Sequence, residues 1–174
     1  MEFSELLITQ HNPMQIHALV FLLGSLTVSS LSDLRRMAAQ ADFAEVWAAY
    51  TIVLFSFDVY LGLTAQMALA PFMLKWVLIV VFAAVTTGSH SFSISTMDVA
   101  AIIALLATLN PVYILITLPM LVLVNELLKP ILSKYGEAGA YPFLPTVLAA
   151  NLILLLIFLA GGIEPYLGLA APMS

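Results

Sequence analysis

A series of long apolar runs, joined by short polar segments, most constrains how this chain can fold. A membrane-spanning helix needs about 20 mostly apolar residues, and several of the runs approach that length. Transmembrane strands would instead produce short segments of alternating hydrophobicity. Only 9% of the residues are charged, whereas water-soluble domains carry about a quarter. We therefore predict an all-α integral membrane protein that crosses the bilayer several times.

The runs predict about six transmembrane helices in a single domain, residues 14–162, with a lead-in of residues 1–13 and a tail of residues 163–174. Asn110-Pro111 separates the fourth run from the fifth, and Gly161-Gly162 ends the last. The segment from Lys129 to Tyr141 is expected to be a loop. The predicted spans are residues 14–34, 43–65, 72–87, 99–109, 112–128 and 142–159, of which the fourth is short.

The positive charges predict the orientation. Arg35 and Arg36 follow the first span, and Lys129 and Lys134 lie between the fifth and sixth. Short loops rich in Lys and Arg remain on the cytoplasmic side of a membrane. The chain is therefore expected to be a multi-pass protein of the cell membrane, with its N-terminus outside and with cytoplasmic loops after spans one, three and five.

This topology brings Asp33 and Asp98 to the same, cytoplasmic side. Ionisable residues in a membrane are costly, so each is a functional candidate. Two carboxylates held close together cannot both ionise readily and share a proton. The ionised carboxylate can then activate water, and the protonated one can polarise a carbonyl and later protonate the leaving amine, as in peptide hydrolysis. The structural alternative pairs Asp33 with Arg36 and places Asp98 at the N-terminus of its helix.

Two segments resemble the conserved blocks of the type IV prepilin peptidases, especially the archaeal preflagellin and prepilin branch. The first block is similar to Ser32-Asp33-Leu34-Arg35-Arg36-Met37 followed by Asp42-Phe43-Ala44-Glu45-Val46-Trp47. The second, the GxGD segment and its helix, resembles Met97-Asp98-Val99-Ala100-Ala101-Ile102-Ile103-Ala104-Leu105 with Asn110-Pro111. Pro119, Asn125 and Pro142-Phe143-Leu144-Pro145 also fit, so the resemblance covers residues 14–160. Ser95 and Met97 stand where the family has glycines.

The resemblance implies that Asp33 and Asp98 are the catalytic pair of an aspartyl intramembrane protease. Such an enzyme removes short basic leader peptides from pilin-like or archaellin-like precursors at the cytoplasmic face. Asp42 and Glu45, beside Asp33, are expected to attract the basic leader by charge complementarity. Glu126 is a further candidate for substrate contact. Its alternative is a solvated helix end, paired with Lys129.

The same composition argues against several other classes of site. The chain has no cysteine, which excludes disulfides, cysteine zinc sites and thiol chemistry. Its His, Asp and Glu residues show no metal-ligand spacing. The five Lys and Arg residues do not form the basic patch of a nucleic-acid-binding protein. We therefore expect no cofactor, metal or nucleic acid, and a membrane-inserted precursor protein and the lipid bilayer as partners.

Asp58 and Lys75 lie in adjacent predicted spans, where they could pair across two antiparallel helices. We expect a structural ion pair or a snorkelling lysine, and a proton relay is the alternative. Asn151, in the last span, is expected to make a hydrogen bond between helices. The alternative function is a non-catalytic relative of the family, or a small transport or scaffold bundle. A transporter would show a polar cavity near the membrane midplane around Asp58 and Lys75.

Overall fold

The structure of the protein is a computed structural model that describes residues 13–36, 42–64, 69–88, 95–136 and 141–163. These residues form six α-helices and one short 3-10 helix, with no strand among them. The expected lead-in and tail lie outside the described residues, apart from their innermost positions. The helices are α2 (Pro13–Arg36), α3 (Asp42–Leu63), α4 (Leu69–Gly88), α5 (Thr96–Ala107), α6 (Pro111–Leu132) and α7 (Leu144–Leu159), with η1 at Ser133–Tyr135.

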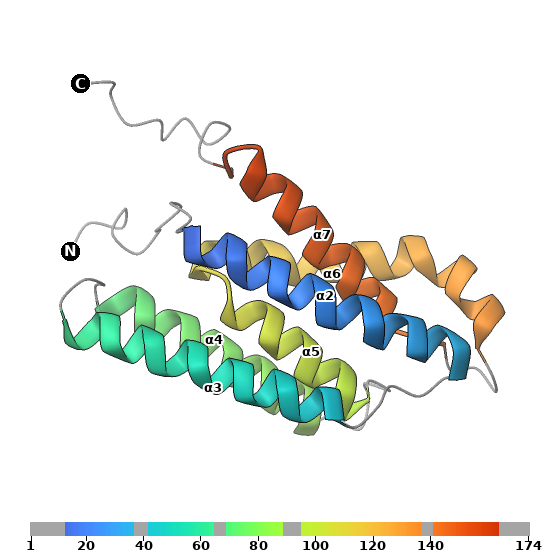
Figure 1. The fold of residues 1–174 in the computed structure, drawn as a ribbon, viewed down its shortest axis with the longest axis horizontal. Coiled ribbons are helices and arrows are strands. Elements are labelled where there is room, and N and C mark those ends of the chain that lie inside the picture. The colour runs from blue at the N-terminus through green and yellow to red at the C-terminus, as the bar shows by residue number, and fades with distance from the viewer. Residues whose placement is uncertain (1–12, 37–41, 65–68, 89–94, 137–140, 164–174) are drawn as a thin grey trace.

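Successive helices run in opposite directions along the long axis of the bundle (Figure 1). The C-terminal ends of α2, α4 and α6 therefore lie at the same end as the N-terminal ends of α3, α5 and α7. This end is called the aspartate end here, because it contains Asp33 in the last turns of α2 and Asp98 in the first turn of α5. The arrangement confirms the predicted order of six antiparallel helices. The orientation of the bundle in a membrane stays a prediction.

Helix α5 is the central helix of the bundle. It packs against α2, α3, α4 and α7, and its side chains are buried over most of its length. Ala101, Ala104 and Ala107 are fully buried, and such small residues let neighbouring helices approach closely. Its 12 residues rise only about 18 Å, less than the hydrocarbon thickness of a bilayer. The short fourth run is thus a core helix enclosed by longer ones.

Four helices are long and apolar enough to cross a membrane, namely α2, α3, α4 and α6 with its 3-10 extension. Helices α5 and α7 are apolar but shorter. Many large apolar side chains point outward from the long helices; Ile52 and Val80 are 64% and 63% exposed. This surface suits contact with lipid and agrees with the prediction of a membrane protein.

The predicted loop from Lys129 to Tyr141 is wrong in its first part. Helix α6 continues to Leu132 although Pro130 lies within it, and η1 follows. The physical reason is burial, because Leu132 is only 5% exposed and extends the apolar face of α6 by one turn. The hydroxyl of Ser133 donates to the carbonyl of Lys129 at 2.6 Å and helps to close this turn.

The breaks predicted from proline and glycine are confirmed. Helix α5 ends at Ala107 and α6 begins at Pro111, where the missing N–H of proline costs no helical hydrogen bond. Helix α7 ends at Leu159, and Gly161 and Gly162 then adopt φ values of 95° and 76°. Only glycine reaches this region without strain. Local chemistry thus sets these helix boundaries.

Candidate active site

Asp33 connects the end of α2 to the start of α7. Its side chain is buried, and Oδ2 accepts a hydrogen bond of 3.3 Å from the backbone N–H of Leu144, the first residue of α7. The backbone N–H of Phe143 also donates toward this carboxylate. The first N–H groups of a helix lack partners within it, and a negative charge there is stabilised by the helix dipole. The side chain of Arg36, its other predicted partner, lies outside the described part.

Asp98 is held by a capping box at the start of α5. The backbone N–H of Asp98 donates to Ser95 Oγ at 3.1 Å. In return, Asp98 Oδ2 accepts from the hydroxyl of Ser95 at 2.8 Å and from its backbone N–H at 3.2 Å. The prediction of Asp98 as an N-terminal helix residue is therefore confirmed. Two of these hydrogen bonds reach the carboxylate of Asp98 and restrict its orientation.

The two aspartates are buried at the same end of the bundle. Both side chains are only 8% exposed, and α2 packs against α5. The charge of Asp33 also contributes to the electrostatic environment of Asp98, but less than burial and the hydrogen bonds from Ser95 do. Each carboxylate is also tied to the first turn of a helix, Asp33 to α7 and Asp98 to α5. The result is two buried acidic groups from two helices at one end of the bundle, one of which is bound by a third helix.

The three weaker candidates lie on the surface. Asp42 and Glu45 occupy the first turn of α3 at the aspartate end, and both are exposed. Glu126 lies near the C-terminus of α6, where its side chain is 63% exposed and pairs with Lys129 at 3.9 Å. That arrangement is the solvated helix end expected as the alternative for Glu126. Asp42 and Glu45 remain available to a soluble segment that approaches the aspartate end.

Sequence reasoning missed several groups around the aspartates. The sequence predicts Ser95 as a loop serine at the position of a family glycine, although a serine three residues before an acid is also the pattern of a capping box. No sequence signal indicated that the N–H of Leu144 would bind Asp33. Ser30 Oγ on α2 and Thr146 Oγ1 on α7 are buried and have no hydrogen-bond partner. Ser30 precedes Asp33 by three residues and therefore shares its helix face.

At the opposite end of the bundle, the predicted ion pair between Asp58 and Lys75 is confirmed. Lys75 Nζ lies 2.7 Å from Asp58 Oδ2, and both side chains are almost fully buried. The indole N–H of Trp76 donates to the same oxygen at 3.0 Å. Asn151 is confirmed as a residue that joins helices, because its Nδ2 donates to the carbonyl of Leu19 at 3.2 Å.

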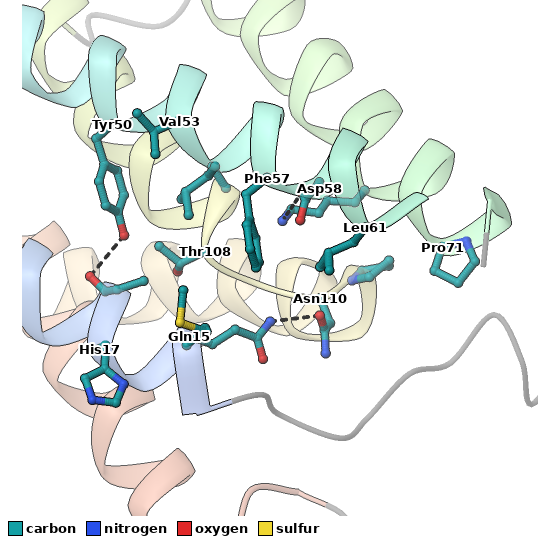
Figure 2. Close-up of a pocket in the computed structure, with 16 residues that line it drawn as sticks. Gln15, His17, Tyr50, Val53, Phe57, Asp58, Leu61, Pro71, Thr108 and Asn110 are labelled. Carbon is teal, nitrogen blue, oxygen red and sulfur yellow. Dashed lines mark hydrogen bonds and ion pairs between the residues drawn. The ribbon is translucent and has the colours of Figure 1, made fainter. Parts of the chain in front are cut away.

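A cavity of about 490 Å³ lies beside this ion pair, where α3 ends and α4 begins (Figure 2). Asp58 and Lys75 line it, but most of its wall is apolar. Along α3 the cavity extends from Leu61, near the end of the helix, to Tyr50 and Val53 in its middle. Its mostly apolar wall differs from the polar cavity expected of a transporter. Within the described ranges, no three His, Asp or Glu side chains group to bind a metal.

No protein-family model matches this sequence, and neither a curated protein nor a solved structure matches it significantly. The resemblance to the prepilin peptidases therefore stays a prediction that rests on the motif residues. Function has to be inferred from what the side chains at the two ends of the bundle can do chemically.

Proposed function

We propose that the protein is a membrane-embedded aspartyl endopeptidase that uses Asp33 and Asp98. One observation carries the proposal: two buried carboxylates, from helices distant in sequence, lie at the same end of the bundle. Burying one acidic side chain without a cationic partner is costly, and burying two together is more so. This cost is lower when the two carboxyl groups hold one proton between them than when both are ionised.

The arrangement supports acid and base roles in one step. Mutual repulsion opposes ionisation of both groups, while the helix N-termini that each contacts favour one negative charge. The ionised carboxylate takes a proton from water, whose oxygen attacks the scissile carbonyl carbon. The protonated carboxyl group donates to the carbonyl oxygen. As the C–N bond breaks, the leaving nitrogen takes a proton from the carboxyl group that deprotonated the water, and a hydroxyl of the intermediate returns its proton to the other carboxylate.

The substrate class follows from the charges near the pair and from the motif resemblance. Asp42 and Glu45 place two exposed negative charges at the aspartate end. A basic leader that emerges from the membrane beside them would be attracted and held there. We propose a type IV pilin-like or archaellin-like precursor as substrate, cleaved between its basic leader and its membrane-inserted helix at the cytoplasmic face.

The test is cleavage of such a precursor by purified protein in lipid nanodiscs, with Asp33→Asn and Asp98→Asn variants. Asparagine retains a side-chain oxygen that accepts the hydrogen bonds from Leu144 or Ser95, so both variants should fold. It cannot exchange a proton, so we expect cleavage to fall by about 10²-fold or more. Glu126→Gln, which removes an exposed carboxylate from the same end, should cleave normally. Normal cleavage by either aspartate variant would leave helix capping as the role of these residues.

A further inference from the structure

The cavity at the end opposite the aspartates is independent of the proposed active site. Its wall on α2 is formed near the start of that helix, by Gln15 and Ala18 among others. Asp33 follows Ala18 by fifteen residues on the same helix, which separates them by about 22 Å along its axis. A molecule in the cavity therefore cannot take part in chemistry at the aspartates, and the cavity needs its own explanation.

The size and lining of the cavity suit a flexible apolar chain. Its volume of about 490 Å³ lies within the usual range for small-molecule sites. Helix α3 contributes Leu54, Phe57 and Leu61 to the wall, with Val53 at the edge (Figure 2). Ala107 and Pro111 form a buried part of the wall on the other side. Most of the lining thus offers only dispersion contacts and burial of apolar surface.

The buried charged groups in the cavity wall have no net charge. Asp58 and Lys75 neutralise each other through the 2.7 Å contact. A charged headgroup would have to separate this buried pair and leave one partner without its counter-charge, which is strongly unfavourable. A hydroxyl group could instead donate to the carboxylate or accept from the ammonium while the pair stays intact. The wall therefore selects for a neutral, hydrogen-bonding head.

The opening of the cavity faces the side of the bundle. Val53 on α3 is 64% exposed and Met14 on α2 is 55% exposed, and both line the cavity. Helix α2 packs chiefly on α7, and its contact with α3 is much smaller. The opening thus lies among apolar surface residues of the kind that contact lipid, so a ligand would enter laterally from the bilayer.

We propose that this cavity binds a neutral single-chain amphiphile from the membrane, of the chemical class of a monoacylglycerol or a long-chain alcohol. The chain lies against the apolar residues of α3, and the hydroxyl head contacts the Asp58–Lys75 pair. This binding site is distinct from the aspartate pair and does not depend on the proposed protease activity.

Two tryptophans at opposite ends of the bundle provide the measurement. Trp76 contacts Asp58 beside the cavity, whereas Trp47 is buried near the start of α3, where it donates to Ser25. The full chain in phosphatidylcholine nanodiscs is titrated with a monoacylglycerol that carries a nitroxide on its chain. We expect saturable fluorescence quenching that unlabelled monoacylglycerol reverses. A Trp76→Phe variant should lose the saturable part, because only Trp47 then remains.

Variants of the cavity test the location. Ala18→Phe fills it from α2 and should weaken binding about tenfold or more. Ala84→Phe, on an exposed position of α4, is the matched control and should bind normally. If Ala18→Phe fails to fold, Val53→Phe at the exposed edge replaces it. Quenching that never saturates, or that is the same in the filled and control variants, would overturn the proposal.

Charged probes test the chemical class. A fatty acid and a fatty amine with the same labelled chain should each bind about tenfold more weakly than the monoacylglycerol. The preference for the monoacylglycerol over the fatty amine should become smaller in a Lys75→Met variant. Asp58 has then lost its cation, and the ammonium group of the amine can take the place of the lysine. Equal or tighter binding of either charged probe to the unchanged protein would refute the neutral-ligand proposal.

Discussion

The hydroxyl of Ser95 donates to Asp98 Oδ2 at 2.8 Å, and the same oxygen of Ser95 accepts the backbone N–H of Asp98 at 3.1 Å. This reciprocal contact fixes the carboxylate at the start of the central helix α5. In the family that the sequence resembles, the position of Ser95 is a glycine, which could not make either bond. The serine thus has a structural role of its own, and orients the carboxylate of Asp98.

Removing the Ser95 hydroxyl should destabilise the protein and disorder Asp98. Ser95→Ala deletes the cap and should lower the free energy of unfolding by about 1 kcal/mol. It should also lower kcat on a precursor, because the carboxylate loses one of its two restraining hydrogen bonds. Ser95→Thr retains the hydroxyl and serves as the control. Denaturant titration and cleavage rates measure the two effects, and an alanine variant equal to wild type in both would contradict them.

The rate of cleavage should depend on pH with a maximum. The proposed step needs one protonated and one ionised carboxyl group. At low pH both groups are protonated and no base remains, so the rate falls as pH decreases. At high pH both are ionised and no acid remains, so the rate falls as pH increases. A profile of kcat against pH tests this, with refolding controls at each extreme. A rate that only rises with pH would indicate a single base instead of a pair.

Charge reversal at the start of α3 should weaken binding of a basic leader. The double variant Asp42→Lys/Glu45→Lys should cost about 1 kcal/mol, or roughly a fivefold increase in KM, with little change in kcat. Both residues are exposed, so the fold should be unaffected. A precursor whose leader has its basic residues replaced by glutamine should show no such difference. Glu126→Lys tests whether any reversed charge at this end has the same effect.

Removing one partner of the buried ion pair should destabilise the protein more than replacing both partners. Lys75→Met leaves Asp58 buried beside Trp76 with no counter-charge and should cost about 3 kcal/mol. The double variant Asp58→Asn/Lys75→Met should recover most of that loss, because the asparagine oxygen still accepts from the Trp76 indole. Unfolding of both variants and of Asp58→Asn completes the thermodynamic cycle. Additive losses in the double variant would show that the two residues do not act as a pair.

Several features of the fold could be predicted because they depend on local chemistry. The apolar runs indicated six helices, and Asn110-Pro111 and Gly161-Gly162 marked where helices break. The contact between Asp58 and Lys75 could be expected because two adjacent antiparallel helices place both residues at similar depth. The extent of α6 was mispredicted because Pro130 suggested a break, whereas burial of Leu132 continued the helix.

The sequence by itself determined which segments are helices, in which order they alternate, and that Asp33 and Asp98 belong to the same end. Hydrophobic run length and turn residues carry that information within each segment. Only the tertiary structure decided that α5 is the enclosed central helix, that Asp33 binds the N–H of Leu144 on α7, and that a cavity opens beside Asp58 and Lys75. These depend on the direction each side chain takes and on which helix faces pack together. Contacts between distant parts of the chain set both, and no single segment contains them.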